Sequence, residues 1–274
     1  MKYFLERAQK EKVPIWQFNF CDLWQFIGIL QGAKKFKKPL ILGTSEGEAK
    51  TLGVEIAATL QKIAQKRLKV PVFLNLDHAK DFDLIKEAIR AGYQMIHFDG
   101  SSLPLKENIK ITKKLVKMCH KKGILVEGEL GEIPKADSPK ESKKLLTDPE
   151  EAKIFAQKTG IDLLAVSIGN VHGILKKMPP LDLARLYVIK KEIEKARLKV
   201  FLVLHGGSGI KREEIKKAVR EGVVKININT ELRIAWKKGL IEDLKSKEVA
   251  PYKVVQRAIE NVAKVVEDKM KIFL

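Results

Sequence analysis

Short apolar, β-branched runs alternate with longer amphipathic segments along the chain. The runs predict parallel strands, and the segments, with apolar residues at helical spacing, predict the helices that connect them. The predicted strands cover residues 15–19, 40–44, 72–76, 94–98, 124–127, 163–168, 200–204 and 224–228. The predicted helices cover residues 22–35, 48–69, 81–91, 108–122, 148–159, 182–196, 212–221 and from 231 onward. This alternation predicts a single-domain (β/α)8 TIM barrel over residues 1–274, a length that suits the roughly 250 residues typical of that fold.

Composition excludes several classes of protein. Cys21 and Cys119 form no C-x-x-C pair, which disfavours a disulfide framework and a thiolate zinc site. No signal peptide and no apolar run of roughly 18 residues is apparent, so we expect a cytoplasmic protein with no membrane partner. The net charge of +19 is spread over the outer faces of predicted helices, which predicts no nucleic-acid partner. A positive field would still attract a phosphorylated substrate.

Three of the five histidines, His78, His172 and His205, each follow a predicted strand. A barrel gathers its distant strand ends on the face where active sites lie, and three neutral imidazoles with an open position form a catalytic zinc site. Glu129 is either a fourth or alternate ligand or a loop-end carboxylate. Asp77 either orients His78 or acts as the general acid/base. Neighbouring side chains of a strand point to different sides, which favours the acid/base role.

A glycine-rich turn follows the seventh predicted strand and suits a phosphate, which backbone N–H groups at a helix N-terminus bind well. The ends of strands seven and eight are the usual phosphate site of this fold. Asn227 and Asn229 share one side of strand eight by two-residue periodicity, so both face the substrate, and Asn227 is placed to bond an enediolate oxygen. These residues also serve as turn formers and helix caps. The substrate-binding candidates here are Gly206, Gly207, Ser208, Asn227, Asn229 and Thr230.

A co-linear series of motifs then carries a resemblance to a known family. It includes T-S-E-G at 44–47, L-D-H at 76–78, E-G-E-L-G at 127–131, G-N-V-H-G at 169–173, L-H-G-G-S-G at 204–209 and K-I-N-I-N-T-E-L-R at 225–233. From about Ile15 to the C-terminus, the chain resembles the class II, zinc-dependent fructose-bisphosphate and tagatose-bisphosphate aldolases. The resemblance implies reversible cleavage of a ketose bisphosphate to dihydroxyacetone phosphate and an aldehyde.

The resemblance also assigns roles to individual residues. It implies Asp77 as acid/base, with His78, His172 and His205 binding Zn2+, for which Co2+ is a possible substitute. It implies that the dihydroxyacetone phosphate half is held by Gly173, Gly206, Ser208, Asn227 and Thr230, and that Asn19 and Ser45 lie on the substrate side. A monovalent cation, Na+ or K+, near the phosphate and a homodimer or higher homo-oligomer are further expectations from the family.

The chain departs from the family pattern in three places. Asn75 replaces a histidine, a change that a core-facing strand position absorbs. The irregular stretch 132–146, whose length suits a lid, lacks the family's Gly-Gly-x-Glu-Asp, so only Asp137 is left as a catalytic stand-in for the glutamate. Ala250-Pro251-Tyr252 replaces an Asp-Pro-Arg whose arginine meets the far phosphate of a neighbouring subunit's substrate. We therefore expect weaker discrimination between a bisphosphate and a 1-phosphate.

Two other classes of function remain open. A Schiff-base aldolase would use Lys225, which we expect to point out of the barrel and therefore disfavour. The second class is a metal-binding homologue that lacks aldolase activity because of its altered loop.

Overall fold

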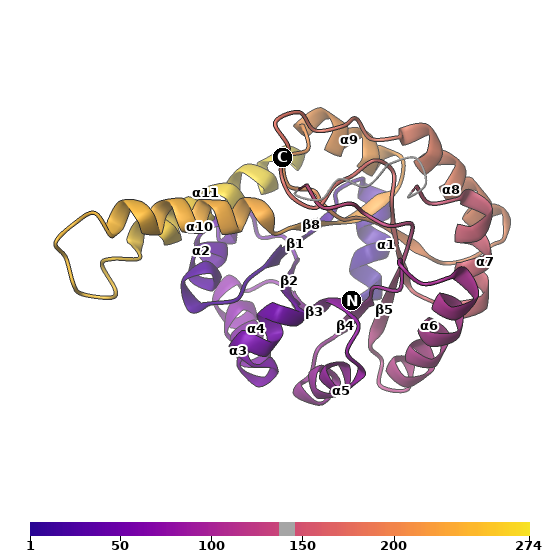
Figure 1. Cartoon of the computed structure of the whole chain (residues 1–274), viewed down its shortest axis with the longest axis horizontal. Helices are drawn as coiled ribbons and strands as arrows, with labels where there is room; N and C mark the ends of the chain where they lie inside the picture. The colour runs from indigo at the N-terminus through magenta and orange to yellow at the C-terminus, as the bar shows by residue number, and fades with distance from the viewer. Residues whose placement is uncertain (137–145) are drawn as a thin grey trace.

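A computed structural model of the chain describes residues 1–136 and 146–274, in which eight parallel strands close into a barrel in chain order (Figure 1). The predicted (β/α)8 TIM barrel is therefore confirmed. β3 and β5 run further than predicted, because residues beyond the predicted ends, such as Ala79 and Glu129, still pair with a neighbouring strand. The strands are β1 (Ile15–Asn19), β2 (Leu40–Ser45), β3 (Val72–Ala79), β4 (Met95–Phe98), β5 (Leu125–Leu130), β6 (Leu163–Val166), β7 (Phe201–Leu204) and β8 (Val223–Ile228).

Helices surround the barrel and pack their apolar faces on its outer surface (Figure 1). Most lie close to their predicted positions, but the helix predicted for 48–69 is broken at Gly53, whose φ of 87° does not fit a right-handed helix. The helices of this ring are α2 (Leu23–Ala33), α3 (Glu46–Leu52), α4 (Val54–Leu68), α5 (Phe82–Ala91), α6 (Leu105–His120), α7 (Pro149–Thr159), α8 (Leu183–Lys195) and α9 (Arg212–Arg220).

An additional helix, α1 (Lys2–Glu11), closes the amino-terminal end of the barrel. Its Leu5 and Ala8 belong to one buried apolar cluster with the strand residues Ile15, Ile41 and Val203. The sequence analysis did not predict α1, because it precedes the first strand and belongs to no strand–helix repeat. This apolar cluster closes the amino-terminal end of the barrel, and the polar interior opens at the carboxyl ends of the strands.

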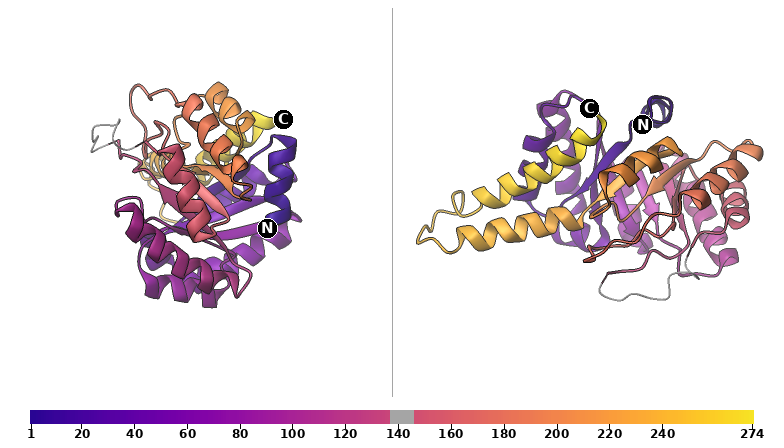
Figure 2. Two further views of the ribbon diagram at one scale, coloured as in Figure 1. Left: turned by 90° about the vertical axis from the view of Figure 1, so that its right-hand side faces the viewer. Right: turned by 90° about the horizontal axis from the view of Figure 1, so that it is seen from above.

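The last two helices, α10 (Thr230–Asp243) and α11 (Gln256–Met270), form a hairpin that projects from the barrel (Figures 1 and 2). α11 packs closely on α2, where a Cβ on Gly32 would lie 2.3 Å from the carbonyl oxygen of Ala263. A short 3-10 turn (Lys271–Phe273) follows. No helix in the two described ranges is long and apolar enough to cross a membrane.

In five strands, the polar residue at the carboxyl end (the upper residue) follows another polar residue two positions earlier (the lower residue). Because they are two positions apart, the side chains of both residues face the barrel interior. The lower residue of each pair is fully buried, at 0% exposure, and the upper one approaches the open end. The upper residues therefore stand on a polar layer that holds them in place. The pairs, lower residue first, are Gln17/Asn19, Asn75/Asp77, His97/Asp99, Glu127/Glu129 and Lys225/Asn227.

Candidate active site

A pocket of about 940 Å³ opens at the carboxyl end of the barrel, and most of the predicted site residues line it. Asn19 and Gly207 lie behind the lining: the Asn19 amide contacts Asp77, and the Gly207 N–H donates to the carbonyl of Asn227 at 3.1 Å. Asp137 lies outside the described residues. The predicted residues that line the pocket are Ser45, Asp77, His78, Glu129, His172, Gly173, His205, Gly206, Ser208, Asn227, Asn229 and Thr230.

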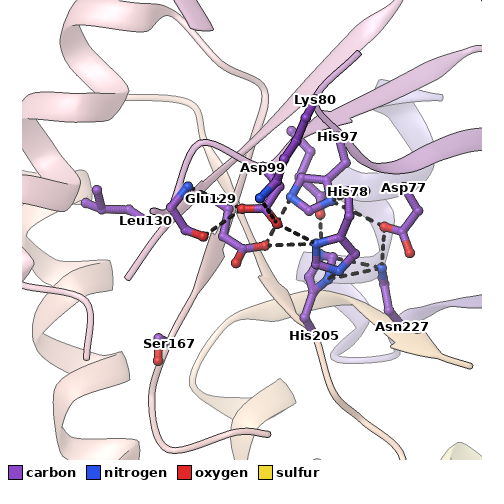
Figure 3. A network of polar contacts seen from close by, with 12 residues as sticks. Asp77, His78, Lys80, His97, Asp99, Glu129, Leu130, Ser167, His205 and Asn227 are labelled. Carbon is purple, nitrogen blue, oxygen red and sulfur yellow. Dashed lines mark hydrogen bonds and ion pairs between the residues drawn. The ribbon is translucent and has the colours of Figure 1, made fainter. Parts of the chain in front are cut away.

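At the centre of the pocket, two imidazole nitrogens face each other (Figure 3). His78 Nδ1 lies 3.2 Å from Asp99 Oδ2, and His205 Nε2 lies 2.6 Å from Glu127 Oε1. Since an ionised carboxylate only accepts, both of these nitrogens are protonated, and His78 Nε2 and His205 Nδ1 are the nitrogens that remain to bind a metal. Those two atoms are 3.0 Å apart, within hydrogen-bond distance of each other. Carboxylate-bound imidazoles whose other nitrogens converge are the donor set of a metal such as zinc.

His172 lies beside this pair. Its ring centroid is 4.8 Å from that of His78 and 6.1 Å from that of His205. Burial, helped by these two imidazoles, lowers the pKa of His172 well below its ordinary value, so its ring is neutral and suited to ligation. Two groups of residues have possible ligand atoms within 4.8 Å of one another, and neither group includes His172. Ligation by His172 stays a prediction that requires its ring to reorient.

Glu129 approaches the opposite side of His78. Its Oε2 lies 3.6 Å from His78 Nδ1, the nitrogen that also contacts Asp99, and 3.2 Å from His97 Nε2. His78, Asp99 and Glu129 form a second group of possible ligand atoms. This placement suits a ligand to an alternate metal position better than a fourth ligand to a metal bound between His78 Nε2 and His205 Nδ1. A ligand role for Glu129 likewise stays a prediction.

Asp77 is buried and held by two amides. Asn19 Nδ2 donates to its Oδ2 at 2.9 Å, and Asn227 Nδ2 donates to its Oδ1 at 3.1 Å. The layer below fixes both amides, since Gln17 donates to Asn19 Oδ1 and Lys225 donates to Asn227 Oδ1, each at 2.8 Å. Burial alone would raise the pKa of Asp77, but the surrounding imidazoles outweigh it and hold the pKa well below its ordinary value. The carboxylate is therefore ionised at neutral pH and oriented as a proton acceptor.

The expectation that Lys225 points out of the barrel was wrong. Lys225 precedes Asn227 by two residues, so both side chains lie on the inner side of β8. Its side chain is fully buried, with Nζ 2.8 Å from Glu127 Oε2. Lys225 is not among the residues that line the pocket, and its ammonium group is paired with a carboxylate.

The candidate phosphate region lies between β7 and α10. Gly206 has a φ of 61°, and a Cβ there would lie 2.4 Å from the carbonyl oxygen of Val171, so glycine is required. The Ser208 hydroxyl accepts the N–H of Glu231 at 3.2 Å, which ties this turn to the first turn of α10. Thr230 begins α10, and the unpaired N–H groups of a helix N-terminus favour an anion.

Sequence reasoning missed several residues of the site. Glu127 lies two residues before the predicted Glu129 on β5, and His97 lies two residues before Asp99 at the end of β4, so two-residue periodicity was a signal that would have found them. It also missed the cations that line the pocket, which belong to loops and a helix without a distinctive pattern: Lys80, Lys135 and Arg233.

Comparisons with known proteins agree with this geometry. The family model described as fructose-bisphosphate aldolase class-II matches residues 1–274. The fructose-bisphosphate aldolase of Geobacillus stearothermophilus is 36% identical and aligns with 100% of this chain and 96% of its own length. The sulfofructosephosphate aldolase of Alkalicoccus urumqiensis is 36% identical over 87% of this chain and 83% of its own length. The solved structure of the YdjI aldolase from Escherichia coli K12 has a TM-score of 0.84 at 29% identity, covering 99% of this chain and 95% of that one.

Proposed function

Because the chain belongs to the class II fructose-bisphosphate aldolase family, we propose that it is a zinc-dependent aldolase that reversibly cleaves a ketose bisphosphate. The first candidate substrate is fructose 1,6-bisphosphate, which would give dihydroxyacetone phosphate and glyceraldehyde 3-phosphate. The observation that carries the proposal is the convergence of His78 Nε2 and His205 Nδ1, 3.0 Å apart, beside the buried carboxylate of Asp77.

In this proposal, His78, His172 and His205 hold the metal. A bound zinc ion supplies the Lewis acid that polarises the substrate ketone, and cobalt is a suitable substitute. Asp77 takes the proton of the C4 hydroxyl while the C3–C4 bond breaks and its electron pair moves to the ketone-derived fragment. The Asn227 amide, held from below by Lys225, donates a hydrogen bond to the enediolate oxygen on which charge develops.

The two ends of the substrate would meet different groups. The near phosphate would lie against the backbone of the Gly206 turn, Ser208 and Thr230, and a monovalent cation beside it remains an expectation from the family. The far phosphate needs a cation, and Lys80, Lys135 and Arg233 line the same pocket. Tyr252, at the position of the family's arginine, is 63% exposed in the connection between α10 and α11 and does not line the pocket of its own chain. We therefore propose these three residues as the cations that meet the far anionic group.

The test is a turnover assay with a panel of ketose phosphates. It should contain fructose 1,6-bisphosphate, tagatose 1,6-bisphosphate, fructose 1-phosphate and the sulfonate analogue indicated by one relative's name. Cleavage of the fructose compound at the highest kcat/KM supports the proposal, and preference for the tagatose epimer or another member reassigns the substrate. A zinc-loaded protein that cleaves none of them would support the metal-binding homologue instead. Trapping by borohydride in the presence of substrate would indicate a Schiff base and overturn the mechanism.

A further inference from the structure

His97, in β4, is a fully buried imidazole whose ring lies against those of His78 and His205 (Figure 3). Its ring centroid lies 4.6 Å from that of His78 and 4.6 Å from that of His205. It is grouped with Asp77, His78 and His205 as a possible source of a ligand atom. The mechanism proposed above assigns it no task, although it touches the acid/base and two of the proposed ligands.

The backbone at His78 shows what His97 does. The pairing of β3 with β4 shifts register between Leu76 and Ala79, and His78, at the shift, has a φ of 50°. That left-handed conformation is uncommon for a residue other than glycine. The interrupted ladder leaves the N–H of His78 without a strand partner, and this N–H donates to His97 Nδ1 at 3.0 Å.

This hydrogen bond also fixes the tautomer of His97. A backbone N–H is always a donor, so Nδ1 must accept and the ring proton lies on Nε2. Asp77 Oδ1 also lies 3.3 Å from Nδ1, the longer of the two contacts that this nitrogen makes. His97 Nε2 lies 3.2 Å from Glu129 Oε2, an ion-pair distance, and neither atom has a hydrogen-bond partner among the described residues.

We propose that His97 is a positioning residue that holds two neighbours of the metal at once. Its Nδ1 fixes the left-handed turn that presents the His78 imidazole to His205, and its Nε2–H holds the Glu129 carboxylate in place. The proposal rests on the proposed metal site. It predicts that the two ring nitrogens have separable tasks, with Nδ1 governing the affinity for the metal and Nε2 governing the position of Glu129.

Three substitutions separate the two nitrogens. Asn at position 97 places an oxygen where Nδ1 lies and keeps the acceptor for His78, but it cannot reach Glu129. Gln at position 97 places an amide near Nε2 and keeps the contact with Glu129, but it lacks the acceptor. Met fills the volume and removes both. The matched control is His120→Gln on α6, whose Nε2 contacts Asp162 at 2.7 Å outside the pocket.

The measurements are cobalt affinity by competition with a chelator, the visible absorption spectrum of the cobalt protein, and thermal unfolding of each metal-free variant. Loss of a group that orients a ligand typically lowers metal affinity about 10- to 100-fold. We expect such a loss for His97→Met and His97→Gln, affinity near wild type for His97→Asn, and a spectral change for His97→Met. The His120→Gln control should match the wild type in every measurement.

The outcomes distinguish the possible readings. Equal cobalt affinity and an unchanged spectrum in His97→Met, or equal affinity in the Asn and Gln variants, would overturn the proposal. A variant that lowers only the unfolding temperature of the metal-free protein, with the cobalt site intact, would show that His97 is a packing residue. If His97→Met does not fold, the comparison of the Asn and Gln variants decides. If the wild type binds no cobalt, the metal site itself fails, and the positioning role fails with it.

Discussion

Replacing Asp77 by Asn tests the proton acceptor while changing the site as little as possible. The substitution keeps the shape of the side chain, but the new amide places an NH2 group opposite either Asn19 or Asn227, both of which donate to Asp77 in the wild type. One buried donor then loses its acceptor, which costs about 1–3 kcal/mol of stability. Loss of the acid/base itself should lower kcat by about 10²–10⁴-fold, which corresponds to about 3–5 kcal/mol in the activation free energy.

The assay is kcat for fructose 1,6-bisphosphate, measured with the zinc content and the unfolding free energy of the same preparation. Asn19→Ala is the matched control, because it removes one of the two donors to Asp77 and leaves the carboxylate. We expect full zinc content in the Asp77→Asn variant and a much smaller loss of kcat in Asn19→Ala. The reasoning is refuted if zinc content falls in step with activity and the rate per bound zinc is unchanged, since Asp77 would then only orient His78.

Three further predictions follow from the polar layer and the pocket. Lys225→Met should destabilise the fold by about 3–5 kcal/mol, because it removes the lysine cation that pairs with the buried Glu127 carboxylate. Lys225→Met/Glu127→Gln should recover part of this loss in denaturant titrations, and a fully stable single variant would contradict the ion pair. Burial alone would raise the pKa of Glu127, but Lys225 and nearby imidazoles outweigh it and lower the pKa. The ionised Glu127 therefore stabilises the fold above the ordinary carboxyl pKa of about 4, and this stabilisation is lost as pH falls. The stability difference between wild type and Glu127→Gln should shrink in acid, and a constant difference would refute the assignment. Replacing Lys80, Lys135 or Arg233 by Met should lower kcat/KM for fructose 1,6-bisphosphate about fivefold to tenfold and leave that for fructose 1-phosphate unchanged, whereas equal losses for both would place these cations away from the far phosphate.

Much of the fold followed from the order of apolar runs, because each strand of a parallel barrel repeats the same pattern. The same reasoning placed His78 and His205 together, since both follow strands whose carboxyl ends meet on one face. It missed α1, which lies outside the repeat, and the break at Gly53, which an uninterrupted helical pattern conceals. The prediction for Lys225 failed because it placed Lys225 on the opposite side of β8 from Asn227, whereas the two residues are two positions apart and share one side.

The chemistry of the centre could not be predicted to the same depth. The sequence shows that imidazoles and carboxylates are present, but which ring nitrogen carries a proton depends on distances between strands that are far apart in the chain. The His78 backbone illustrates this, because nothing in L-D-H indicates a left-handed residue whose N–H needs His97 as its acceptor. Asp137 lies outside the described residues, and the predicted assembly of several subunits stays a prediction.

The central claim is that turnover depends on a metal held by the histidines, and removal of that metal tests it most directly. Cleavage of fructose 1,6-bisphosphate should be measured in the wild type, in protein stripped by a chelator, and in stripped protein to which zinc or cobalt has been restored, with metal content determined for each. His172→Ala should lose the metal and the activity while keeping its far-UV circular dichroism, because the barrel is held by its own apolar core. The account predicts no turnover without metal and recovery in proportion to the zinc bound. Full activity in the metal-free protein would contradict it.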